Sequence, residues 1–110
     1  MGRPIAGEIV VLPFPQTNLQ QGKRRPALII RSLPLGDLIL CQITAQARDD
    51  EFCVSLARGD LERGRLAVDS VIRVSRLFTV EKSVVLYVAG KVRDSKMAEV
   101  TAKLRQLFAT

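Results

Sequence analysis

The apolar residues of this chain occur in short runs separated by turn-forming residues, and this spacing limits the fold more than any other feature. The runs are rich in Val, Ile and Leu, and Pro, Gly or Asp residues lie between most of them. One run, residues 68–74, alternates with a period of two, as a strand with two different faces does. Strands are therefore predicted at residues 8–14, 27–31, 38–43, 52–56, 68–74 and 84–88.

The C-terminal segment is the one stretch with a convincing helical period. Apolar residues, with one threonine among them, recur there at helical spacing: Met97, Val100, Thr101, Leu104, Leu107 and Phe108. Asp94 or Ser95 is the predicted N-cap. Because helices do not alternate with strands along the chain, a βαβ fold is excluded. The predicted fold class is mainly β (α+β), a small barrel of short antiparallel strands with a C-terminal helix.

The length of 110 residues predicts a single domain spanning residues 1–110, because domains commonly have about 100–150 residues. Residues 1–6 precede the first predicted strand and are expected to be flexible. No apolar run approaches the roughly 20 residues of a membrane span, and the N-terminus has no apolar signal segment. We therefore expect a cytoplasmic protein that does not bind membranes.

The chain is strongly basic, with 17 Lys and Arg residues against 11 Asp and Glu residues and a net charge of +6. Long-range attraction and counterion release then favour polyanionic partners. Histidine is absent, which excludes a histidine general base, a Ser-His-Asp triad and a His–Cys zinc site. Cys41 and Cys53 are expected to be buried or half-buried thiols, and residues 49–51 a solvated acidic loop. No metal or cofactor is expected.

The remaining candidates for chemistry are cations and hydroxyl groups near strand ends. Lys23 and Arg24 end a long polar stretch, and Arg25 follows them. Pro26 holds the backbone of Arg25 extended, which fixes the starting point of that side chain. Thr44 follows the third predicted strand. Two interpretations stay open: these residues bind an anion, or the cations are solvated and the threonine caps the backbone.

Four sequence blocks carry a resemblance to a known family. The first is GEIVVLPFPQTNLQQGKRRPALII at residues 7–30, in which a polar loop and an Arg-Pro step lead into an apolar strand. The others are Ile-Thr-Ala-Gln at residues 43–46, Asp-Ser-Val-Ile at residues 69–72 and Thr-Val-Glu-Lys at residues 79–82. In this order they resemble the PemK/MazF-like toxin family of bacterial toxin–antitoxin systems, over nearly the whole chain.

The resemblance implies the toxin component of a type II toxin–antitoxin system, with an SH3-like barrel that forms a homodimer. Most members of the family are sequence-specific, metal-independent endoribonucleases. They cut single-stranded RNA such as mRNA and leave a 2′,3′-cyclic phosphate and a 5′-hydroxyl. The implied partners are a cognate antitoxin with an acidic C-terminal segment and operator DNA, the latter only as a complex with the antitoxin.

The family's catalytic residues carry over to Arg25 and Thr44. Further residues are expected to bind RNA: Lys23, Arg24, Gln46, Arg76 and Thr79. Residues 16–24 are expected to gate the RNA groove. Some family members have an arginine directly before the later threonine, where this chain has Phe78. Arg76, two positions earlier, faces the same side of a regular strand, and it either supplies that charge or is a surface cation.

Two other functions stay open. A gyrase-poisoning toxin of the CcdB type has the same barrel, but its known members depend on a C-terminal Trp-Gly-Ile ending, and this chain has no Trp. A non-catalytic nucleic-acid-binding module would account for the net charge alone. The aromatic content of 5% argues against a base-stacking surface of that kind. Cleavage of naked RNA by the purified protein distinguishes the endoribonuclease from both alternatives.

Overall fold

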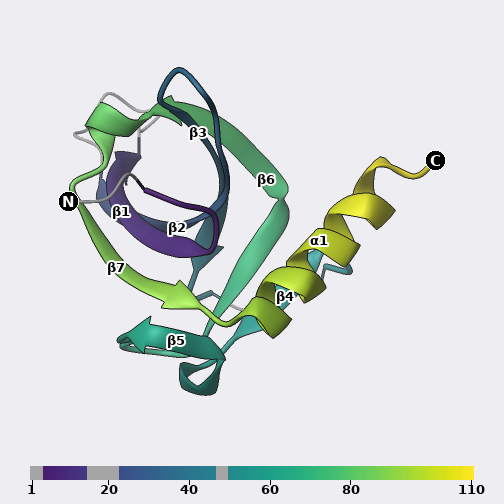
Figure 1. Ribbon diagram of the computed structural model, residues 1–110. Helices are drawn as coiled ribbons and strands as arrows, with labels where there is room; N and C mark the ends of the chain where they lie inside the picture. Colours follow the sequence, from purple (N-terminus) through teal and green to yellow (C-terminus); the bar gives the residue numbers. More distant parts are fainter. Residues whose placement is uncertain (1–3, 15–22, 47–49) are drawn as a thin grey trace.

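The computed structural model describes residues 4–14, 23–46 and 50–110, which form one antiparallel sheet and one long helix (Figure 1). The strands are β1 Glu8–Phe14, β2 Lys23–Ser32, β3 Asp37–Thr44, β4 Cys53–Leu56, β5 Leu61–Gly64, β6 Ser70–Glu81 and β7 Tyr87–Val92. The helix α1 spans Asp94–Phe108, and the short 3₁₀ helices are η1 Arg58–Asp60 and η2 Lys82–Val84. The predicted fold class, mainly β with a C-terminal helix, is confirmed.

The strands form a single sheet in the order β4-β6-β3-β2-β1-β7-β5, and every neighbouring pair is antiparallel. β1 lies between β2, its neighbour in the sequence, and β7, which comes from the far end of the chain. Register shifts occur in several of these pairs, and such bulges bend and twist a strand. The sheet curls around itself into the small barrel that the sequence predicts (Figure 1).

The core consists of two hydrophobic clusters, because successive side chains of a strand point to opposite faces of the sheet. Ile9 and Leu28 belong to one cluster, which also contains Val100 of α1. Val10 and Ile29 belong to the other cluster, whose buried members all come from strands. Helix α1, which packs against β6 and β4, therefore completes only the first of the two clusters.

Helix α1 buries a narrower apolar face than its sequence period predicts. Val100 is fully buried, with Met97 and Leu104 packed beside the same cluster, whereas Phe108 is 70% exposed. Lys96 is buried on this side of the helix, with 7% of its surface exposed. Within the described residues, no helix is both long and apolar enough to cross a membrane.

The predicted N-cap of α1, Asp94 or Ser95, is wrong. Arg93 is the N-cap residue, and no side chain caps the first turn. The backbone N–H of Arg93 donates instead to the carbonyl oxygen of Asp60 at 2.8 Å. The start of the helix is therefore set by the contact with η1, a long-range contact that local sequence signals do not contain.

The strand β5 was not predicted from the sequence, because residues 57–65 are charged and contain glycines. This strand pairs with β7, and Gly64 lies opposite Gly90. The φ angle of Gly64 is +90°, and a Cβ there would collide with the carbonyl oxygen of Ala89 and the Cα of Gly90. The strand thus depends on a close approach of two backbones rather than on an apolar side-chain pattern.

Three other strands have different limits from those predicted. β2 begins earlier, at Lys23, because the polar residues before Ala27 pair with β1. β6 continues to Glu81, since its second half pairs with β3. Residues 82–84 form η2, so the last strand starts at Tyr87. In the first two cases a strand partner sets the boundary, and in the third case η2 does.

The segment expected to be flexible, residues 1–6, lies partly outside the described residues. In its described part, the carbonyl oxygen of Pro4 accepts a hydrogen bond from Ser32 Oγ at 2.8 Å. The backbone N–H of Ile5 donates to Glu8 Oε1, also at 2.8 Å. These two bonds connect the segment to β2 and β1.

Candidate functional site

A groove of about 990 Å³ opens on the surface formed by β1, β2, β3 and β6. Its polar lining consists of the cations Arg25, Arg73 and Arg76, the amides Gln42 and Gln46, and the hydroxyls Thr44, Ser75 and Thr79. Apolar residues, among them Leu12, Phe14 and Phe78, line the rest. We call it the cationic groove, because its described lining contains three arginines and no carboxylate.

Most of the predicted site residues line this groove, although they come from different strands. These are Arg25, Thr44, Gln46, Arg76 and Thr79. Lys23 and Arg24 do not line it; they are exposed at the start of β2 and directly precede Arg25 on that strand. Residues 16–22, most of the segment predicted to gate the groove, lie outside the described residues.

Arg25 is half-buried and lies opposite Leu12 of β1, in an extended part of β2. Its guanidinium group has no hydrogen bond or ion pair with any residue that the structure describes. An arginine stays protonated at all ordinary pH values, and its planar donors match the oxygens of a phosphate or carboxylate. Arg25 therefore offers the groove a positioned cation whose donors no described residue occupies.

Thr44 is the last residue of β3. Its Oγ1 accepts a hydrogen bond from the backbone N–H of Gln46 at 3.2 Å, which is the ordinary role of a threonine at the end of a strand. The hydroxyl hydrogen has no acceptor within the described part of the chain. The same group can therefore hold the turn with its oxygen and donate its hydrogen to a ligand.

A bulge in β6 forms one wall of the groove. Between two consecutive residues of β3, the pairing moves from Leu77 to Arg73, so residues 74–76 have no partner in β3. Bulges redirect side chains and are frequent beside functional sites. Two residues of this bulge, Ser75 and Arg76, line the groove.

Arg76 and Phe78 both line the groove, and they contribute differently. The ring of Phe78 packs edge-on against Phe14, with ring centroids 5.0 Å apart and an interplanar angle of 69°. This aromatic pair forms an apolar wall between β1 and β6. Arg76 is exposed and has no ion pair among the residues described, so it supplies positive charge beside that wall.

Arg73 lines the groove, but the sequence analysis did not include it among the site residues. It is half-buried, and its Nε is a buried polar atom without a hydrogen-bond partner in the described structure. One signal in the sequence could have found it. Arg73 is a single cation between Ile72 and Val74, in a run whose other residues at that point are apolar.

No three metal-ligating side chains lie together among the described residues. In the acidic loop, Asp50 uses its Oδ1 to accept a hydrogen bond from the N–H of Phe52 at 2.8 Å, and Asp49 lies outside the described residues. Cys41 is buried, its Sγ donates to the carbonyl oxygen of Val74 at 3.8 Å, and burial raises the pKa of its thiol to about 12. The described groove thus offers guanidinium, amide and hydroxyl groups for chemistry.

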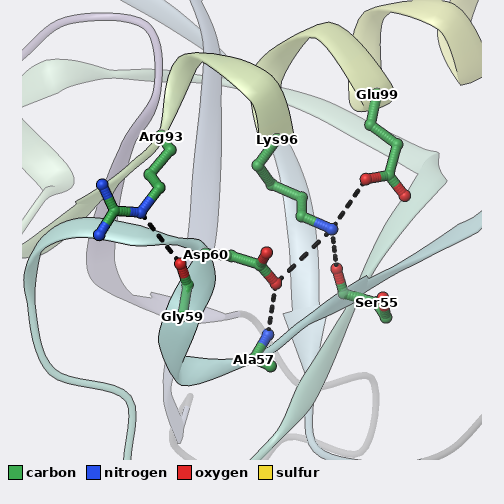
Figure 2. A network of polar contacts seen from close by, with 7 residues as sticks. All are labelled: Ser55, Ala57, Gly59, Asp60, Arg93, Lys96 and Glu99. Carbon is green, nitrogen blue, oxygen red and sulfur yellow. Dashed lines mark hydrogen bonds and ion pairs between the residues drawn. The ribbon is translucent and has the colours of Figure 1, made fainter.

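A second polar cluster joins α1 to β4 and η1 (Figure 2). The ammonium group of Lys96 donates to the carbonyl oxygen of Ser55 and to Glu99 Oε1, each at 2.9 Å. It also forms an ion pair with Asp60 at 3.6 Å, and the same carboxylate oxygen accepts from the N–H of Ala57 at 2.8 Å. The cluster satisfies its own charges, and none of these residues lines the cationic groove.

Comparison with known proteins shows that the chain matches a protein family over most of its length. Residues 5–108 match the family described as PemK-like, MazF-like toxin of type II toxin–antitoxin system. No curated protein sequence matches the chain.

Several solved structures have the same fold. MazF (Form-I) from Deinococcus radiodurans is 28% identical with a TM-score of 0.77, and the match covers 100% of both chains. In the MazE-MazF complex (Form-II) from the same organism, the matched chain is 27% identical with a TM-score of 0.78, covering 97% and 96%. An endoribonuclease from a mycobacterial species is 16% identical with a TM-score of 0.72, covering 96% and 91%; this last likeness concerns the fold alone.

Proposed function

Because the chain belongs to the PemK-like, MazF-like toxin family of type II toxin–antitoxin systems, we propose that it is an endoribonuclease. Its substrate is single-stranded RNA such as mRNA, cut at a short specific sequence without a metal ion. The products end in a 2′,3′-cyclic phosphate and a 5′-hydroxyl. The observation that carries this proposal is the cationic groove, in which Arg25 and Thr44 lie with two further arginines and no described carboxylate.

The electrostatics of the groove suit a polyanion. None of its three arginines is held in an ion pair with a described residue, so an entering phosphate has no carboxylate of the described residues to displace. Charge-assisted hydrogen bonds from guanidinium to phosphate are short and about twice as strong as neutral ones. The excess of positive charge on the whole chain also raises the rate at which RNA and protein meet.

The reaction requires little covalent chemistry from the protein, because RNA supplies its own nucleophile. The 2′-oxygen forms a bond to the scissile phosphorus, and the bond from phosphorus to the 5′-oxygen breaks. One proton leaves the 2′-hydroxyl and one proton is taken up by the departing 5′-oxygen. Negative charge increases on the non-bridging oxygens during this exchange, so orientation and charge stabilisation are what the protein must provide.

Arg25 provides that stabilisation by pairing its planar donors with the non-bridging oxygens. Thr44 donates its hydroxyl hydrogen to the same phosphate, while the hydrogen bond from Gln46 N–H, 3.2 Å long, holds the threonine oxygen in place. The other expected contacts position the RNA. The side chains of Gln46, Arg76 and Thr79 bind it inside the groove, and Lys23 and Arg24 bind phosphates beyond its edge.

We further propose that the protein is a cytoplasmic homodimer whose cognate antitoxin places an acidic C-terminal segment in the cationic groove. The likeness to a chain of a MazE-MazF complex, at 27% identity, supports an antitoxin partner. Carboxylates of such a segment compete with RNA phosphates, because both need the same arginines. Operator DNA is bound only by the complex of toxin and antitoxin.

The test is cleavage of one long naked RNA by the purified protein in excess EDTA. Primer extension locates the cuts, and the new ends are identified chemically. We expect cuts at one short sequence, with a 2′,3′-cyclic phosphate on one product. Arg25→Ala, purified in parallel, reveals any contaminating ribonuclease, and Arg105→Ala on the exposed face of α1 is the matched control. A folded protein that leaves RNA intact contradicts the function, and activity that depends on magnesium contradicts the mechanism.

A further inference from the structure

We infer that Arg73 binds a backbone phosphate of the RNA within the cationic groove. This inference rests on the proposed function and assigns to that site a residue that sequence signals did not identify. It is carried by the burial of the Arg73 side chain, by its missing partners and by the rigidity of its strand.

The first observation is the unpaired Nε atom. Arg73 is half-buried, its Nε is inaccessible to solvent, and this atom has no hydrogen-bond partner among the residues described. Its side chain also forms no ion pair there. Buried polar groups are nearly always paired. Among the Arg73 nitrogens only Nε is buried without a partner, so the terminal guanidinium nitrogens are the ones that a ligand in the groove can reach. An arginine without partners in the described protein is better explained by a role in binding a ligand than by a role in stabilising the fold.

The second observation is the place of Arg73 in the sheet. It pairs with Gln42 of β3 on one side and with Cys53 of β4 on the other. Its backbone is therefore fixed from both sides, whereas Arg76 lies in the bulge without a partner in β3. Both Arg73 and Gln42 line the groove. Arg73 is thus the arginine of β6 that is better positioned before RNA arrives.

A phosphate is the ligand group that this environment favours. The described lining of the groove holds three arginines and no carboxylate, so the positive charge of Arg73 is not neutralised locally. An anion neutralises it, while the neutral edge of a guanine base only satisfies its donors. A phosphate contact has a clear signature, because it contributes to the salt dependence of binding and is the same for every sequence.

The experiment measures binding of a short single-stranded oligonucleotide made uncleavable by 2′-deoxy nucleotides, by fluorescence anisotropy at several salt concentrations. For Arg73→Met we expect affinity to fall about ten-fold to a hundred-fold and the salt slope to decrease by about 0.7. The melting temperature should equal or exceed that of the wild type, because the variant removes a buried unpaired donor. Arg73→Lys should restore part of the affinity, and Arg105→Met should behave as the wild type in all three measurements.

The other outcomes overturn the inference, the proposed function, or both. Unchanged affinity and salt slope in Arg73→Met overturn it, as does a fall in melting temperature with affinity retained, which marks a structural arginine. A change in the cleaved sequence with an unaltered salt slope replaces the phosphate by a base contact. If the wild type binds the oligonucleotide but never cuts RNA, the proposed function fails and the Arg73 measurement still stands. A wild type that does not bind overturns both.

Discussion

Lys96 and Arg73 are both cations drawn into the protein, and their surroundings are opposite. Lys96 is 7% exposed, and its ammonium group is surrounded by oxygen atoms of Ser55, Asp60 and Glu99 (Figure 2). Arg73 carries a buried Nε that no described residue satisfies, and it shares its groove with two further unpaired arginines. One region neutralises its positive charge internally, and in the other no described residue neutralises it.

This difference shows what a net charge leaves out. The value of +6 states how much positive charge the chain carries, but the pairing of each cation determines where that charge can act on a partner. A cation with internal acceptors contributes to folding, because its removal leaves those acceptors unpaired. A cation without such acceptors is solvated or available to a ligand, so its removal should change stability little. The two regions therefore predict opposite responses to mutation.

The largest expected effect is on catalysis at Arg25. Arg25→Ala should lower the cleavage rate by about 10²–10³, because a positioned donor to the transition-state charge is lost. Its melting temperature should stay close to that of the wild type, since no described residue pairs with its guanidinium. Rates under single-turnover conditions and a thermal melt by circular dichroism measure the two quantities.

Two further variants sharpen this result. Arg25→Lys should recover only part of the rate, because an ammonium group cannot reproduce a planar fork. Thr44→Ala should cost less than Arg25→Ala, since a neutral hydrogen bond contributes about 0.5–1.5 kcal/mol. If Arg25→Ala folds normally and still cuts at more than about a tenth of the wild-type rate, well short of the expected loss, Arg25 is not the catalytic residue. The contrast between the two regions then does not hold.

The next largest effect is on stability at Lys96. Lys96→Met should lower the free energy of unfolding by about 1–3 kcal/mol, because the Ser55 carbonyl and the Asp60 carboxylate lose their shared donor. Urea denaturation measures this value, with the exposed Arg105→Met as the control. Cleavage per folded molecule should stay at the wild-type level. An unchanged unfolding midpoint, or an activity loss larger than the unfolded fraction, would show that the cluster is not a purely structural one.

The smallest effect is expected at Arg24, which is exposed beside the groove rather than in it. Arg24→Ala should weaken RNA binding only a few-fold and lower the salt slope by about 0.7, as the loss of one phosphate contact does for a single strand. Cleavage at saturating RNA should change little. A rate loss as large as that of Arg25→Ala would place Arg24 in the catalytic machinery and remove the distinction between groove and edge.

The sequence predicted the elements whose signals are local. The apolar runs gave most of the strands and the fold class, and the C-terminal period gave α1. The strand β5 was missed because Gly64 and Gly90 meet through their backbones, a contact that composition does not encode. The N-cap of α1 was predicted wrongly because a long-range bond from Arg93 to Asp60 fixes the start of the helix.

The site residues also divide into those with a local sequence signal and those that depend on long-range contacts. The Arg-Pro step and the threonine at a strand end identified Arg25 and Thr44 as candidates, and both line the groove. For Arg73 the sequence offers only a weak signal, a single cation between two apolar residues, because the missing partner of its Nε cannot be read from the sequence. A vacant hydrogen-bonding position exists only in three dimensions, when β3 and β4 have closed on both sides of β6.

The pairing of β1 with β7 ties the groove to the timing of synthesis. The ribosome releases β1 before its partner β7 and before the helix residue Val100. The described residues of the groove lie between Leu12 and Val80, so they leave the ribosome before the elements that secure their strands. Contacts between distant parts of a chain form late in folding. The groove therefore lacks part of the strand pairing that holds it until β7 has been synthesised and has paired with β1.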